Sequence, residues 1–83
     1  MMKLMVQFRL QPGMKNKAVE FFENRGPNRN PGVTFGGAWI GKDSDVVFVL
    51  VESADQAIVT SVGQSWDQFG THEVFPVLDI QQF

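Results

Sequence analysis

Two side chains of this 83-residue chain carry the chemistry of a general acid or base. His72 is the single histidine, and imidazole readily gains or loses a proton near neutral pH. Glu52 ends an apolar run and could accept a proton from a molecule bound in a cavity. Each has a simpler interpretation: His72 follows Gly70 and Thr71 in a polar turn, and Glu52 precedes a predicted helix start, where negative charge is favourable. Both are candidate catalytic residues.

Gln7 and Arg9 are candidates for ligand binding because they alternate with an apolar row in the same segment. They are expected to point away from the side that the apolar row buries. A polar group buried there needs a partner, which could be Glu52 or Glu73, water, a ligand, or the same groups across a dimer interface. The dimer-interface network is the simplest of these interpretations.

Trp39 and Trp66 are the only tryptophans and complete the candidate ligand-binding set. Each is large enough to line a pocket for a flat ligand. Single tryptophans nevertheless belong more often to a core or an interface, so burial in the core is the default expectation for both.

Composition excludes several classes of site. The chain has no Cys and no Tyr, which rules out thiol nucleophiles and phenolic acids, and no serine lies in a Gly-x-Ser-x-Gly motif. The single His has no companion motif for a metal or haem, and Gly36-Gly37 lacks the context of a phosphate-binding loop. We therefore expect neither a cofactor nor a metal.

The formal net charge of -2 argues against electrostatic binding to nucleic acid or to an anionic membrane. The longest apolar run, Val46 to Val51, is far shorter than the roughly 20 residues of a membrane helix. These features, with the absence of Cys, predict a cytoplasmic protein that binds neither nucleic acid nor membrane.

Hydrophobic patterning predicts one domain over residues 1–83 with four strands and two helices in the order βαββαβ. The strands are expected at 3–10, 33–40, 46–52 and 73–80, and the helices at 14–24 and 53–69. Gly26-Pro27 should stop the first helix, and residues 28–32 should form a loop. Pro76 lacks a ladder donor, which places the last strand at a sheet edge.

Two details of these elements can be predicted from local sequence. Gly36-Gly37 suggests a bulge in the second strand, with Val33, Phe35 and Trp39 on one face and Thr34, Ala38 and Ile40 on the other. Ser53 and Gln56 have the spacing of a capping box, which would start the second helix. Its buried stripe is expected to comprise Ile58, Val62, Trp66 and Phe69, and Gly63 would permit a close contact with the sheet.

The order βαββαβ is the ferredoxin-like pattern, an α+β fold in which both helices cover one face of a four-stranded antiparallel sheet. The uncovered face is apolar in the third and fourth strands whichever row meets the helices. Leaving about six such side chains in water would forgo on the order of 10 kcal/mol. We therefore expect a homodimer in which two sheets pack face to face as a dimeric α/β barrel.

A spaced pattern runs through nearly the whole chain: Leu4-Met5-Val6 leading to Pro12-Gly13, Ala18 to Phe22, Pro31-Gly32-Val33, Val51-Glu52-Ser53, Glu73 to Leu78, and Trp66-Asp67 before the last strand. It resembles the domain-of-unknown-function 3303 family of the dimeric α/β-barrel superfamily. The resemblance implies a barrel-like homodimer but no activity. Residues 37–41 depart from it, because the family has an Arg-Trp-His-Gly type sequence there and this chain lacks that histidine.

The sequence is compatible with three functions. The first is a homodimer that binds a small apolar molecule between its two sheets. The second is a cofactor-independent enzyme of the monooxygenase or isomerase type, with His72 or Glu52 as the acid or base. The third is a regulatory small-molecule sensor whose sheets join side by side. A pocket of about 300 Å³ or more that includes His72 or Glu52 would favour a binder or an enzyme.

Overall fold

The computed structural model describes residues 1–25 and 31–83. Along the chain it contains β1 (Met2–Leu10), α1 (Lys15–Arg25), β2 (Val33–Ile40), β3 (Val46–Ser53), α2 (Gln56–Gln64), β4 (Gly70–Pro76) and a 3₁₀ turn, η1 (Ile80–Gln82). This order confirms the predicted α+β, ferredoxin-like fold. The predicted helix stop at Gly26-Pro27 and most of the predicted 28–32 loop lie outside the described residues.

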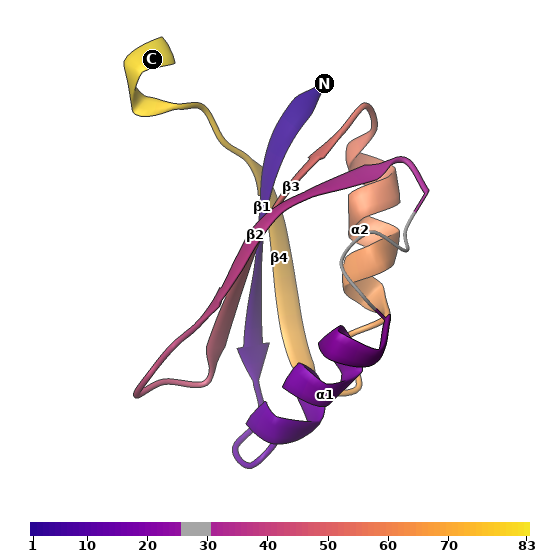
Figure 1. Ribbon diagram of the computed structural model, residues 1–83, viewed down its shortest axis with the longest axis vertical. Helices are drawn as coiled ribbons and strands as arrows, with labels where there is room; N and C mark the ends of the chain where they lie inside the picture. Colours follow the sequence, from indigo (N-terminus) through magenta and orange to yellow (C-terminus); the bar gives the residue numbers. More distant parts are fainter. Residues whose placement is uncertain (26–30) are drawn as a thin grey trace.

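The four strands form one antiparallel sheet in the order β2-β3-β1-β4. Both helices lie on the same side of the sheet, and the segment after β4 leaves on the other side (Figure 1). β4 is an edge strand, as Pro76 predicted. Among residues 1–25 and 31–83, no α-helix covers the other face of the sheet.

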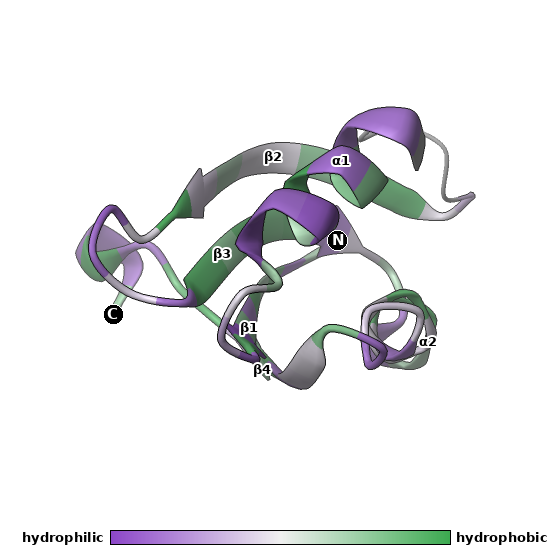
Figure 2. Ribbon diagram, turned by 90° about the horizontal axis from the view of Figure 1, so that it is seen from below, coloured by the Kyte–Doolittle hydropathy of each residue, from purple (hydrophilic) through white to green (hydrophobic). Residues whose placement is uncertain are grey.

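The core lies between the helices and one face of the sheet. β1 contributes four alternate buried side chains, Leu4, Val6, Phe8 and Leu10, and β3 contributes Val47, Val49 and Val51. Figure 2 shows that β3 is hydrophobic along most of its length. These two central strands supply most of the sheet's share of the core because they are flanked by strands on both sides.

The bulge in β2 is present, but it changes the predicted faces of that strand. The register of β2 against β3 shifts between Phe35 and Gly37, so Phe35 lies opposite Val51 and Trp39 lies opposite Phe48. An extra residue inverts the alternation beyond it. The prediction that Phe35 and Trp39 share a face was therefore wrong: Phe35 faces the helices and Trp39 faces away.

The start of α2 also differs from the prediction. Asp55 is the N-cap, and its side chain accepts a hydrogen bond from the Ala57 amide at 2.9 Å. Ser53 instead ends β3, where it is fully buried and its hydroxyl accepts a hydrogen bond from the Asp55 amide. Ser53 therefore shapes the turn before the helix, and the predicted capping box does not form.

Trp66 and Phe69 of the predicted stripe are buried, but they follow the end of α2 at Gln64, and within the helix the buried side differs from the prediction. Val59 is 1% exposed, whereas Ile58 is 37% exposed. Gly63 makes the predicted close contact with the sheet, because a Cβ atom there would come within 2.7 Å of the Cδ2 atom of His72. The contact fixes which side of α2 meets β4, and Val59 lies on that side.

β4 begins three residues earlier than predicted and ends at Pro76. Two consequences follow. His72 belongs to the strand rather than to the preceding turn, and Ile80 belongs to η1 rather than to the strand. None of the helices among residues 1–25 and 31–83 is long and apolar enough to cross a membrane.

Candidate functional site

The uncovered face of the sheet, here called the open face, gathers most of the predicted site residues. Residues directly opposite in an antiparallel pair share a face, so the strand register defines its members. They are Lys3, Met5, Gln7 and Arg9 of β1, Val46, Phe48, Leu50 and Glu52 of β3, Thr34, Gly37 and Trp39 of β2, and Thr71, Glu73 and Phe75 of β4.

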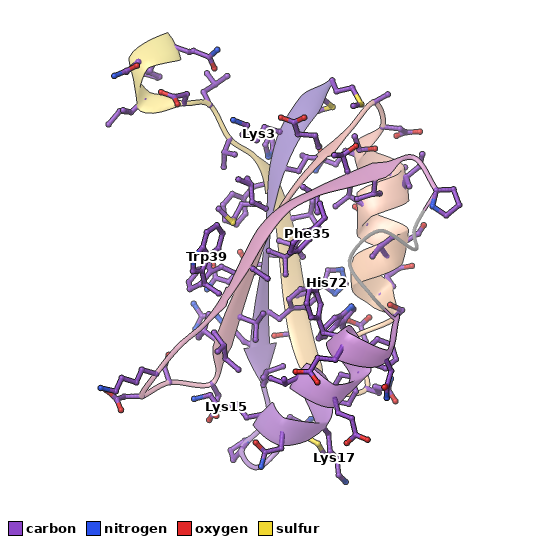
Figure 3. The ribbon with its side chains drawn as sticks, in the orientation of Figure 1. Lys3, Lys15, Lys17, Phe35, Trp39 and His72 are labelled. Carbon is purple, nitrogen blue, oxygen red and sulfur yellow. The ribbon has the colours of Figure 1, made fainter. Side chains whose placement is uncertain are left out.

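Aromatic side chains are the most exposed apolar groups of the open face. Trp39 is 56% exposed, and Phe48 and Phe75 are each 37% exposed. Figure 3 shows Trp39 on the side of the sheet away from the helices, whereas Phe35 points toward them. Met5 and Leu50 lie opposite each other between these aromatics and are half-buried. Together they form a continuous apolar surface across the sheet.

Gln7 and the charged members of the open face fall into two groups. Gln7 lies opposite Glu73, and Arg9 is two residues further along the same face. At the other end of the sheet, Lys3 lies opposite Glu52. Among the described residues, no side-chain hydrogen bond or ion pair holds these five groups.

Glu52 and Lys3 line a hollow of about 360 Å³ at this end of the open face. Its remaining walls come from both ends of the chain and are mostly apolar, comprising Met1, Met2, Pro76, Val77, Leu78 and Gln82. The backbone holds this region together, because the Val77 amide donates a hydrogen bond to the Lys3 carbonyl at 2.9 Å. The hollow can accept a molecule with an apolar body and one polar end.

His72 lies on the opposite side of the sheet from Glu52. It pairs with Phe8 in the register and faces α2 (Figure 3). Its Nδ1 lies 2.6 Å from the Oδ1 atom of Asp67, and its side chain is 14% exposed while that of Asp67 is 53% exposed. The expectation that His72 sits in an exposed polar turn was wrong, because β4 begins before it and turns it toward the helix.

The two tryptophans lie in different environments. Trp66 is 8% exposed and stacks on Phe8 with ring centroids 4.8 Å apart. Phe21 approaches it edge-on, with centroids 5.2 Å apart. Trp66 is therefore a core residue, whereas Trp39 is exposed on the open face.

The tertiary structure thus divides the predicted site residues. Gln7, Arg9, Trp39 and Glu52 share the open face, whereas His72 and Trp66 lie beneath the helices. Two neighbours were not predicted from the sequence: Asp67 as the partner of His72, and Lys3 as the neighbour of Glu52. The alternation in β1 puts Lys3 on the same face as Gln7, so Lys3 could have been predicted as a residue of this face. The Asp67 contact, in contrast, depends on the turn between α2 and β4. Within residues 1–25 and 31–83, no three His, Asp or Glu side chains gather as a metal site would require.

Comparison with known proteins identifies a family and nothing narrower. No curated protein and no solved structure matches the chain. The model of the family described as domain of unknown function (DUF3303) matches residues 2–83, which is nearly the whole chain, and the protein therefore belongs to that family.

Proposed function

We propose that this protein works as a homodimer whose two open faces pack together and hold a small, largely apolar molecule between the sheets. The exposure of Trp39, Phe48 and Phe75 on one helix-free face is the observation that carries the proposal. A second copy of the chain offers the same apolar surface, and a two-fold axis would bring the two surfaces together. This arrangement is the dimeric α/β barrel.

Burial of the open face would stabilise the dimer substantially. Fully burying a large apolar side chain contributes roughly 1.5 to 3 kcal/mol. Met5, Val46 and Leu50 are already half-buried in the single chain. The free energy of about 10 kcal/mol expected from burying six side chains is therefore an upper bound. The three exposed aromatics supply most of what remains, which makes each of them a sensitive position.

The polar groups of the open face suggest where the molecule would be held. Gln7, Arg9 and Glu73 lie close to one another near the end of β1, where they could pair across the two-fold axis. Lys3 and Glu52 instead border the 360 Å³ hollow, whose size lies within the range of small-molecule sites. We place the apolar part of the ligand against the sheet and its polar end at Lys3 and Glu52.

The dimer predicts a mass in solution of about twice the 9.3 kDa of the chain. Phe48→Asp puts a charge into the interface and should yield monomers at micromolar concentration, whereas Ile58→Asp should remain a dimer. Ile58 is a matched control because it is also 37% exposed but lies on α2. Size-exclusion chromatography with light scattering measures both variants.

The same variants test the ligand. Octanoate, an apolar chain with one anionic end, should raise the melting temperature of the parent protein and of Ile58→Asp but not that of Phe48→Asp. A parent protein that elutes as a 9.3 kDa monomer contradicts the dimer. A dimer formed through edge strands, with the open faces still accessible, would instead support the sensor-type function.

A second function, a cofactor-free enzyme with His72 as its base, is favoured by one observation. The 2.6 Å contact between Nδ1 and Asp67 selects the tautomer whose Nε2 atom carries the free lone pair, which is the arrangement of a histidine base. Its Nε2 must then be reachable from solvent, although it lies beside Gly63. Glu52 cannot assist it, since the two residues are on opposite faces of the sheet.

Carbethoxylation by diethyl pyrocarbonate, which transfers an ethoxycarbonyl group to a free imidazole nitrogen, measures whether Nε2 is reachable, and the chain has only one histidine to modify. If His72 is a catalytic base, it should react within about threefold of the rate of free imidazole. Asp67→Asn should slow this reaction, because it weakens the contact that orients the imidazole ring. If His72 reacts with the reagent only after unfolding, it is not a catalytic base. The His72–Asp67 contact would then only link β4 to the turn after α2.

A further inference from the structure

We propose a second binding site, for a small one-ring or two-ring aromatic molecule that carries an amine, in a pocket between α1 and β2. The pocket has a volume of about 210 Å³ and lies on the helix side of the sheet. It is separate from the open face and from the hollow at Glu52. The site does not depend on the dimer proposed above.

Apolar groups form the floor and walls of the pocket. Trp66 and Val47, both 8% exposed, lie at its base, and Phe22 and Ala18 of α1 form one wall. Ala38 of β2 lies on the other side. Phe22 and Trp66 are themselves close, with ring centroids 6.2 Å apart, so the pocket presents aromatic rings to an occupant. Flat apolar molecules fit such a lining.

The mouth of the pocket exposes apolar side chains that the fold does not cover. Ile40 is 43% exposed and Val19 is 37% exposed, and they border the pocket from β2 and α1. Trp39, a residue of β2, also borders the pocket, although its ring points to the open face (Figure 3). The packing of two open faces leaves Ile40 and Val19 uncovered, so the dimer does not explain their exposure.

Size and charge decide the class of occupant. A dry cavity of about 150 Å³ holds benzene, so about 210 Å³ has room for one or two rings but not for a helix or strand of a partner protein. Among the described residues, Glu23 is the one charged side chain that lines the pocket, and no ion pair involves it there. Its carboxylate at the rim favours a ligand whose apolar ring enters and whose ammonium group stays at the mouth.

Benzylamine is a suitable probe, and toluene is its uncharged counterpart. In a Trp39→Phe background, Trp66 is the only tryptophan, and its fluorescence should change saturably with benzylamine at a dissociation constant on the order of 1 mM. Ala38→Leu fills the pocket and should weaken binding at least about tenfold. Ala57→Leu, on the exposed side of α2, should change it less than about twofold.

Glu23→Gln separates the role of charge from that of shape. It should weaken benzylamine binding up to about fivefold and leave toluene binding unchanged, because only the amine meets the carboxylate. Amide chemical-shift changes of the parent protein on addition of benzylamine test the site without any substitution. They should cluster at Ala18, Phe22 and Ala38.

Three outcomes overturn the site: a fluorescence change linear in benzylamine, equal affinity in Ala38→Leu and Ala57→Leu, or shift changes centred on the open face. The failure of this site leaves the dimer untouched, since light scattering on Phe48→Asp tests that separately.

Discussion

Gly70→Ala is expected to destabilise the fold by about 2 to 3 kcal/mol, enough to lower the melting temperature by roughly 10 to 20 °C. A Cβ atom at Gly70 would overlap the carbonyl oxygen of Arg9 and would lie 2.9 Å from the Cα atom of Leu10. Both contacts are with the backbone of β1, the central strand next to β4. Unlike a flexible side chain, this backbone cannot move without breaking its ladder with β3. Thermal and urea unfolding measure the loss.

Gly13→Ala is the matched control for that substitution. Gly13 has a φ of +83°, but a Cβ atom there meets nothing within 4 Å. The control should therefore cost about 1 kcal/mol from backbone strain alone. Equal destabilisation by the two alanines would show that the close approach of β4 to β1 at Gly70 is not tight.

Trp66→Ala is expected to cost about 3 to 5 kcal/mol, as large-to-small substitutions of core aromatics do. Trp66 joins α1, the sheet and the turn after α2, because its ring meets Phe21, Phe8 and Phe69 at centroid distances of 5.2, 4.8 and 6.0 Å. No smaller residue can contact all three. Chemical denaturation followed by circular dichroism measures the change in the free energy of unfolding.

Trp39→Ala provides the comparison, since it removes the same side chain from a site that is 56% exposed. Measured at a concentration where light scattering shows monomers, it should cost less than about 1 kcal/mol. A cost equal to that of Trp66→Ala would contradict the placement of Trp39 on the open face. At higher concentration Trp39→Ala should weaken the proposed dimer.

The alternation of apolar and polar residues in the strands was sufficient to predict the fold. Leu4, Val6, Phe8 and Leu10 alternate strictly, and all four are buried. The period of two survives any packing arrangement because successive side chains of a strand must point to opposite faces. The edge position of β4 followed equally directly from the missing amide of Pro76.

Local signals failed where two elements compete for the same residues. Ser53 is a residue type that often caps helices. Pairing of β3 with β1 nevertheless extends to Ser53, and Asp55 caps α2 instead. Similarly, pairing with β1 extends β4 back to Gly70 and takes His72 out of the turn. Ladder hydrogen bonds with a neighbouring strand decide such boundaries, and no single segment contains that information.

For the candidate site, the sequence by itself determined that Gln7 and Arg9 oppose the buried row of β1, because alternation alone places them there. Only the tertiary structure decided that Trp39 joins them, since the bulge at Gly36-Gly37 inverts the face of β2 beyond it. Only the tertiary structure also separated His72 from Glu52 and paired it with Asp67. The physical reason is that a face follows from the two-residue period of one strand, whereas contacts between elements depend on register, bulges and turns that form only when the sheet assembles.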